Sequence, residues 1–334
     1  MFFIWGFQDI QRYKARLLIF SMSRYIKAVF TVICIGLIFV SCRNKTEQYD
    51  SPVKGKIFIS VDESFEPVIS EEIKVYQSAH PGTEIVASYK SEADCFRDLQ
   101  KDSTRLIIVS RGLTEDENVY YKQTLSFKVQ WDILAYDAVV IIANKKSNDS
   151  VFTINRLKNY LDGTDTSKYI AVDGKNATST VMLLKDSILK GGSFGKNVMA
   201  ASGSEELIKY VSGNENAIGF IGFSWVGDAD DPKQRAYSNY LRFGLIECKI
   251  CGKDTYARPS QATISAGQYP LVRPLFFILK ENTLGLGSGF VNFLSLERGQ
   301  LIFRRSYLVP AKMNFTVRKT MMETNQNLLN KTTE

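Results

Sequence analysis

The sequence predicts an α/β fold made of two compact units, and three observations predict it. Apolar β-branched runs alternate with segments whose apolar residues recur every three or four positions, which is typical of a mostly parallel sheet with helices on both faces. One long apolar run, residues 133–144, interrupts this alternation, which then restarts. The 334 residues, of which 45% are hydrophobic and 23% charged, are enough for two cores.

The first predicted unit begins with a buried strand at residues 57–61. A helix follows from Phe65, with Pro67 in its first turn, and ends at the His-Pro-Gly sequence of residues 80–82. Strand-like apolar runs and helix-like spacing of apolar residues then alternate again. They predict a strand at 84–89, a helix at 91–99 and a strand at 105–109.

The run at residues 133–144 is too short and too rich in β-branched residues for a membrane helix, so we expect one or two central strands there. The elements of the second unit are predicted beyond it. They are a helix at 154–161, a strand at 169–172, helices at 179–189 and 205–211, and a strand at 217–223. Near the end, residues 269–280 are typical of a strand, and a helix is predicted around 288–296.

The N-terminal segment has the pattern of a secretory signal peptide. Residues 22–42 contain a short basic head, an apolar stretch at 28–40 and a small residue before Cys42. The apolar stretch is shorter than the ~20 residues that span a bilayer, and its Ser-Cys end resembles a bacterial lipobox. We expect a lipoprotein of the periplasm or cell envelope, anchored in the membrane through Cys42; the alternative is an uncleaved anchor helix. Residues 1–21 are interpreted as an upstream extension or a start-site artefact.

Composition excludes several classes of protein. The net charge of +7 falls to +3 without residues 1–41, because 37 basic and 34 acidic residues remain. No basic block is interleaved with aromatic residues, so we expect no nucleic-acid partner. With one histidine, His80, and one C-x-x-C pair, Cys248 and Cys251, we expect no metal and no cofactor. We interpret the cysteine pair as incidental or structural in an oxidising compartment.

Three predicted strand ends carry hydroxyl groups and helix caps. In an open α/β sheet, ligands bind beyond the carboxyl ends of strands, where loops lead into helix N-termini. The segments are SVDES at 60–64, VSRGLTEDE at 109–117 and VDGKNATST at 172–180. Each offers backbone N–H groups and the positive end of a helix dipole to an anion. Helix capping explains any one of them alone, whereas the three together predict a cleft for a small oxyanion.

Arg111 is the arginine best placed in these segments for a charge-assisted bond to that anion. Asp62 and Glu63 would repel a fully ionised anion, but they can accept a proton from a protonated one such as hydrogen phosphate. An acidic acceptor therefore discriminates against sulfate, which is fully ionised at neutral pH. The alternative is that both acids only complement the dipole of the helix that follows them.

The chain resembles a known family in these segments and in several others. The secreted lipoprotein signal, the strand-DESF-helix opening, RLIIVSRGLTEDE, AYDAVVIIAN, KNATST, GNENAIGFIGF, YPLVRPLFFIL and ERGQLIFRRSYLVP are similar, in that order, to the phosphate-binding proteins of bacterial ABC transporters. The nearest form is the lipoprotein of Bacteroidetes-type bacteria, and the resemblance covers residues 54–311. It implies a type II periplasmic-binding-protein fold, in which two α/β lobes joined by a two-strand hinge clamp phosphate between them.

The resemblance also implies domain boundaries. We expect lobe 1 at residues 55–142 and 224–311 and lobe 2 at 143–223, after a tether at 42–54 and before a polar tail at 312–334. By position, the family's ligand contacts fall on the following residues: Ser64, Phe65, Ser110, Thr178, Ser179 and Thr180. Asp62, Glu63 and Arg111 complete the predicted site. Other members carry an Arg-x-Asp-x-Ser-Gly-Thr motif where this chain has DGKNATST, so either Arg111 supplies the missing charge or the ligand is not phosphate.

The predicted function is capture of inorganic phosphate, without chemistry, by a monomer that delivers it to the permease subunits of an ABC-type importer. An oxyanion sensor, or a binding lipoprotein for another ligand without a transport role, is the alternative. A hydrolase is the third class, since GGSFG at residues 191–195 matches G-x-S-x-G. That motif needs a preceding strand and a histidine base, and Ser193 instead follows the end of a predicted helix.

Overall fold

The computed structural model of the chain describes residues 50–174 and 178–312. The predicted signal peptide, the predicted lipid anchor Cys42, most of the predicted tether and nearly all of the predicted tail lie outside the described residues. Among the helices of the described part, none is both long enough and apolar enough to cross a bilayer.

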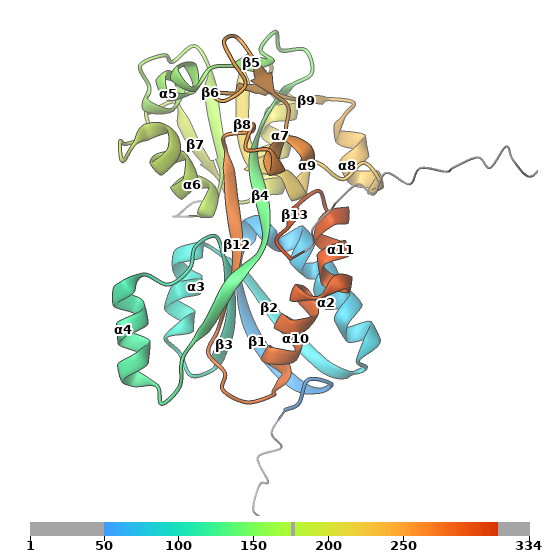
Figure 1. Cartoon of the computed structure of the whole chain (residues 1–334). Coiled ribbons are helices and arrows are strands. Elements are labelled where there is room, and N and C mark those ends of the chain that lie inside the picture. The colour runs from blue at the N-terminus through green and yellow to red at the C-terminus, as the bar shows by residue number, and fades with distance from the viewer. Residues whose placement is uncertain (1–49, 175–177, 313–334) are drawn as a thin grey trace, which may run out of the picture. The chain divides into compact units, whose positions relative to one another are not determined.

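A mixed sheet runs through the described residues (Figure 1). Its main strands are β1 Lys54–Asp62, β2 Gly82–Lys90, β3 Thr104–Val109, β4 Gln130–Asn144, β6 Tyr169–Asp173, β7 Val198–Ala201, β8 Ala217–Gly222 and β12 Val272–Leu279. Their spatial order is β2-β1-β3-β12-β4-β8-β6-β7. β1 is parallel to β2 and β3, and β6 is parallel to β7 and β8. β4 and β12 are antiparallel to each other and join the two parallel parts.

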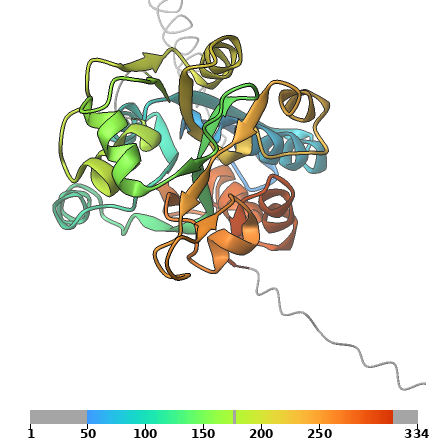
Figure 2. The same cartoon turned by 90° about the horizontal axis from the view of Figure 1, so that it is seen from above.

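Helices lie on both sides of the sheet (Figures 1 and 2). Beside the β1–β3 part they are α2 Glu66–Ala79, α3 Glu92–Leu99, α4 Glu115–Thr124, α10 Leu286–Ser295 and α11 Glu297–Arg305. Beside the β6–β8 part they are α5 Ile154–Asp162, α6 Ser179–Leu184, α7 Ser204–Gly213, α8 Pro232–Tyr237 and α9 Gln261–Ser265. The α/β class and the periplasmic-binding-protein type of architecture predicted from the sequence are thus confirmed.

The apolar run of β3 is explained by burial on both faces. Leu106 and Ile108 pack into one core with residues of α2 and α10, whereas Ile107 and Val109 pack into another with residues of α3 and α4. Side chains of a strand alternate between its two faces, so a strand covered on both sides has no polar face. The sequence of β3 is therefore apolar at consecutive positions instead of alternating between apolar and polar residues.

Local capping sets the starts of the predicted helices. Ser91 accepts a hydrogen bond from the backbone N–H of Asp94 and caps α3. A capping box is present at the start of α4, where the side chains of Thr114 and Glu117 each bond to the backbone of the other residue. The predicted helix at 179–189 begins as α6 and continues as a π-helical segment, η2 Lys185–Leu189.

β4 is one continuous strand that passes from one core to another. Its residues 134–135 pack with β1, α2 and α10, whereas residues 138–142 pack with β6, β8 and α7. β12 runs beside it over eight residues. Two strands that share two cores are the arrangement expected of a hinge, and we propose that β4 and β12 form it.

The packing around β4 also bears on the predicted lobe boundaries. Buried residues between 241 and 271 belong to the same core as β6 and β8, although the sequence assigned residues 224–311 to the other lobe. We therefore propose that lobe 2 extends to about residue 271. Several short elements in and beside this region were not predicted from the sequence. They are β5 Val151–Phe152, β9 Leu241–Phe243, β10 Leu245–Glu247, β11 Tyr256–Ala257, α8 and α9. In other parts of the fold, β7 and β13 Val309–Pro310 were not predicted either. Their segments are too short to show a period.

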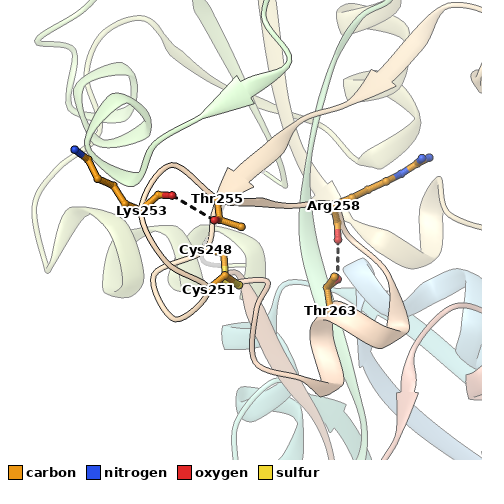
Figure 3. The surroundings of a disulfide bond; sticks show 6 residues. All are labelled: Cys248, Cys251, Lys253, Thr255, Arg258 and Thr263. Atoms are coloured by element: carbon orange, nitrogen blue, oxygen red, sulfur yellow. Dashed lines mark hydrogen bonds between the residues drawn. A yellow bond between two sulfur atoms is a disulfide. The ribbon is translucent and has the colours of Figure 1, made fainter.

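The C-x-x-C pair forms a disulfide between Cys248 and Cys251 (Figure 3). It closes a loop that follows β10, and the N–H of Cys248 donates to the carbonyl of Thr255 across that loop. Cys95, a third cysteine of the described chain, is buried and free. The two cysteines are therefore paired with each other, while the interpretation of the pair as incidental or structural in an oxidising compartment stays a prediction.

Candidate functional site

Arg273 lies at the centre of a buried polar cluster between the two parallel parts of the sheet. The side chain, on β12, is 2% exposed. Its Nε and Nη2 donate to Asp137 Oδ2 at 3.1 and 2.8 Å, and its Nη1 donates to Ser179 Oγ at 2.7 Å and Thr180 Oγ1 at 2.9 Å. Its guanidinium carbon is 4.6 Å from the ring centroid of Phe65. One arginine thus connects β4, the start of α6 and the segment after β1.

Asp62 joins two segments that are far apart in the sequence. It ends β1 and is fully buried. Its Oδ1 accepts from the N–H of Ser64 at 2.9 Å, in the short helix η1 Glu63–Phe65, and its Oδ2 accepts from the N–H of Ser179 at 3.0 Å. A carboxylate of the protein therefore receives amide hydrogens from two helix starts, one on each side of the hinge that we propose.

Asp173 ends β6 beside this bond and is 1% exposed. Its Oδ2 accepts long hydrogen bonds from Ser64 Oγ at 3.4 Å and Ser204 Oγ at 3.5 Å, while its Oδ1 has no partner among the described residues. Burial, with the nearby Asp62 charge, raises the pKa of Asp173 to about 6, although Arg273 opposes this. Asp173 is therefore an acceptor that a donor group can still satisfy.

Gly174 and Thr178 are the described residues between β6 and α6. Thr178 Oγ1 accepts from the N–H of Val181 at 3.3 Å and donates to the carbonyl of Asp173 at 2.9 Å, so it caps α6. Gly174 has a φ of +82°, and a Cβ there would lie 2.5 Å from Glu63 Oε1. Only glycine allows the loop to approach Glu63 so closely.

Glu63 lies at the edge of the cluster and is half-buried. Burial, together with the negative charges of Asp173, Asp62 and Glu66, raises the pKa of Glu63 to about 7. The cluster therefore holds a carboxyl group that changes its charge near neutral pH.

We expect Glu63→Gln to stabilise the protein at alkaline pH. The carboxyl titrates near 7 when folded and near 4.5 when unfolded, so the unfolded chain ionises first and stability falls as pH rises between these values. Because Glu63 is partly exposed, solvent screening limits the gain to about 1 kcal/mol at pH 8, with almost none at pH 4. Urea unfolding at both pH values checks this. An equal gain at both would show that titration is not its cause.

A hollow of about 410 Å³ opens beside the cluster. Its lining consists of Glu63, Glu66, Ser202, Gly203, Ser204, Glu205, Glu206 and Trp225. The indole Nε1 of Trp225 donates to the carbonyl of Ser64 at 3.0 Å, which holds this ring against the cluster. Glu205 pairs with Lys233 at 2.5 Å, and Glu206 accepts from Ser202. Within the described part of the chain, no three His, Cys, Asp or Glu side chains are placed to hold a metal ion.

Six of the predicted site residues lie in this cluster and a seventh, Glu63, at its edge. The six are Asp62, Ser64, Phe65, Thr178, Ser179 and Thr180, all buried. Ser110 instead donates through its N–H and hydroxyl to Glu92, at 2.9 and 3.0 Å. Arg111 makes a two-bond contact with Glu117 at 2.8 and 2.9 Å and stacks over Phe96. The ligand roles of Ser110 and Arg111 stay predictions, because the hydrogen bonds of both side chains in the structure go to glutamates and a backbone carbonyl rather than to the Arg273 cluster.

Sequence reasoning did not identify Arg273, Asp137 or Asp173 as site residues. Each is a single charged residue in or at the end of an apolar strand, in VRPLFFIL, AYDAVVIIA and YIAVD. A charged residue within a buried strand needs a partner of opposite charge, so this pattern could have indicated the three residues as site candidates. Arg273 and Asp137 are also directly paired in the antiparallel register of β12 and β4. That register, rather than the strand pattern, brings them together.

Comparisons with known proteins identify the family of the chain. Residues 46–297 match the family model described as the PBP superfamily domain. The phosphate-binding protein PstS 2 of Streptococcus pneumoniae, in strains TIGR4 and R6, is 26% identical over 137 residues. This match covers 41% of the present chain and only 40% of the length of those relatives.

Two solved structures have a similar fold. One is a Clostridium perfringens protein with bound phosphate, at a TM-score of 0.64 and 21% identity, covering 77% of this chain and 100% of that one. The other is an ABC-type phosphate transport receptor from Vibrio cholerae, at a TM-score of 0.57 and 18% identity, covering 76% of this chain and 99% of that one. At these identities the likeness concerns the fold.

Proposed function

The chain belongs to the PBP superfamily, and from that premise we propose that it is a solute-binding protein that captures a phosphate group for an ABC-type importer. The observation that carries the proposal is the Arg273 cluster. Its guanidinium contacts two hydroxyls of α6, and the same region holds Ser64 from the other side of the hinge. Arginine and hydroxyl donors in a water-excluded site are the groups that bind phosphate oxygens most strongly.

The buried carboxylates favour an anion that carries a proton over one that is fully ionised. Asp62 and Asp173 can accept hydrogen bonds but cannot donate them when ionised. A phosphate group that carries a proton can donate to them, whereas sulfate at neutral pH cannot. We therefore propose selectivity for phosphate over sulfate. Arg273 takes the role that the sequence suggested for Arg111.

We propose that the protein acts outside the cytoplasm as a monomer anchored through Cys42, with an ABC permease as its partner. The signal-peptide pattern before Cys42 supports export. The Cys248–Cys251 disulfide supports an oxidising compartment. The solute-binding relatives support binding without chemistry.

Titration calorimetry of the mature protein with phosphate, sulfate and molybdate tests the function. We expect stoichiometric binding of phosphate, a rise in melting temperature with phosphate concentration, and no turnover of phosphate esters. Thr180→Val keeps the shape of the side chain and removes the hydroxyl that Arg273 contacts, so we expect about 10- to 100-fold weaker binding.

Thr124→Val, at an exposed position of α4, is the matched control and should leave the affinity unchanged. Failure of every phosphate compound to bind would refute the proposed function. Hydrolysis of a phosphate ester by the protein would show instead that it is an enzyme.

A further inference from the structure

A second hollow, of about 500 Å³, is lined by residues of α8, β9 and neighbouring strands. The apolar part of its lining includes side chains of β4, β9 and β10, namely Ile142, Leu241, Phe243 and Leu245. The volume is within the roughly 300–1,000 Å³ range of small-ligand sites. None of the residues that line it belongs to the Arg273 cluster or lines the hollow beside Glu63. This hollow is therefore separate from the candidate phosphate site.

Three basic side chains line the second hollow, and no acidic side chain does: Lys145, Arg242 and Arg258. Lys145 Nζ donates to the carbonyl of Ser238 at 2.8 Å, and Arg242 Nη2 donates to the carbonyl of Lys145. The guanidinium carbon of Arg258 lies 6.0 Å from the ring centroid of Phe243. Within residues 50–174 and 178–312, none of these three cations forms an ion pair with a carboxylate. The hollow therefore carries positive charge that the described chain does not neutralise.

The backbone positions of the two arginines are set by contacts within the protein. Arg242 lies on β9 and is paired with Ala143 of β4 in the antiparallel register. The carbonyl of Arg258 accepts a hydrogen bond from Thr263 Oγ1 at 2.6 Å, and its side chain extends away from Thr263 and from the disulfide (Figure 3). Donors on a backbone that is already fixed lose less conformational entropy when a ligand binds.

A neighbouring hollow of about 620 Å³ shares Arg258 but is less suited to an anion. Its lining includes Asp228 as well as Arg235. Asp228 Oδ1 accepts hydrogen bonds from two backbone N–H groups and has no cationic partner in the described part of the chain. This carboxylate repels an anion, whereas no carboxylate lines the hollow of Arg242. An anionic ligand is therefore favoured in the hollow of Arg242.

We propose that this hollow is a second binding site and that its ligand is a small amphiphilic carboxylate. The apolar body of the ligand packs against β4, β9 and β10, and its carboxylate binds Arg242 and Arg258. A planar guanidinium can bind a carboxylate through two parallel hydrogen bonds. A singly charged carboxylate is favoured over a phosphate dianion, because taking the second charge out of water into a largely apolar lining costs more free energy. The site goes beyond phosphate capture and does not depend on it.

Calorimetry at neutral pH, in excess inorganic phosphate, tests the proposal with four probes: 4-phenylbutyrate, 4-phenylbutanol, 4-phenylbutylamine and acetate. The alcohol keeps the apolar body without the charge, the amine reverses the charge, and acetate keeps the charge without the body. We expect 4-phenylbutyrate to bind at least about 10-fold more tightly than each of the other three. Equal affinity for the acid and the alcohol, or no binding of the acid, would overturn the inference.

Variants locate the binding of the acid. Arg242→Gln/Arg258→Gln should weaken the binding of 4-phenylbutyrate about 10-fold and leave that of 4-phenylbutanol unchanged. Arg235→Gln/Lys249→Gln removes the same charge at exposed positions outside the hollow and should keep the affinity for the acid. Arg258→Gln alone, at an exposed position, should weaken the acid about 3-fold, which keeps the test valid if the double variant does not fold. Full affinity for the acid in the folded double variant, or in Arg258→Gln, would refute the site.

Discussion

Arg273→Met is expected to abolish ligand binding and to lower the free energy of unfolding by about 3–5 kcal/mol. The substitution removes four hydrogen bonds and leaves Asp137 as an unpaired buried carboxylate. Burial already raises the pKa of Asp137 against the opposing effect of Arg273, so loss of the arginine must raise it further. Urea unfolding and calorimetry with the phosphate compounds measure the two effects.

A second variant separates folding from binding. Arg273→Met/Asp137→Leu removes both charges of the pair, and replacement of a buried ion pair by apolar residues commonly preserves stability. We expect this double variant to fold with nearly the original stability and still not to bind. Binding by the double variant would rule out Arg273 as the group that holds the ligand.

Two single-arginine substitutions complete the series. Arg105→Met breaks an ion pair with Asp50 that is remote from the cluster, and it should leave the affinity unchanged. Arg111→Ala tests the role that the sequence suggested. Since Arg111 is bonded to Glu117, we expect binding to persist, and its loss would restore Arg111 as a ligand residue.

Glu72→Met is expected to stabilise the protein by about 3 kcal/mol at pH 7. Glu72 lies on the buried face of α2, is fully buried, and neither of its carboxyl oxygens has a partner among the described residues. Burial raises the pKa of Glu72 to about 10. At neutral pH the folded protein must keep this group protonated while the unfolded chain ionises it, and this difference costs stability.

The pH dependence identifies the cause of that gain. Because the folded pKa is the higher one, the cost grows as pH rises from about 4.5 toward 10. The advantage of Glu72→Met should therefore be larger at pH 8 than at pH 5, as measured by urea unfolding. Glu71→Gln, at the exposed neighbouring position, should change stability by less than about 0.5 kcal/mol. A gain for Glu72→Met that does not vary with pH would contradict the assignment of a buried protonated carboxyl.

The sequence by itself determined the positions of most helices and strands, and it determined the site residues that lie at the ends of those strands. The strand before Asp62, the caps at Ser91 and Thr114, and the hydroxyls at the start of α6 were predictable from sequence, because period and capping depend on residues within a few positions of one another. The general fold followed, since alternating strands and helices with apolar faces have few ways to pack.

Tertiary structure alone decided the partners of the charged residues. Arg273 meets Asp137 and the α6 hydroxyls across 93 to 136 positions, and Asp62 meets Ser179 across 117. Arg111, which the sequence placed near these hydroxyls, is instead bonded to Glu117 six positions away. A buried charge must find an opposite charge, but the sequence does not state which one. The register of β4 against β12 determines that Arg273 pairs with Asp137, and the packing of β1 against α6 brings Asp62 to Ser179. The energy of a buried ion pair depends on this geometry, which residues close together in the sequence do not specify.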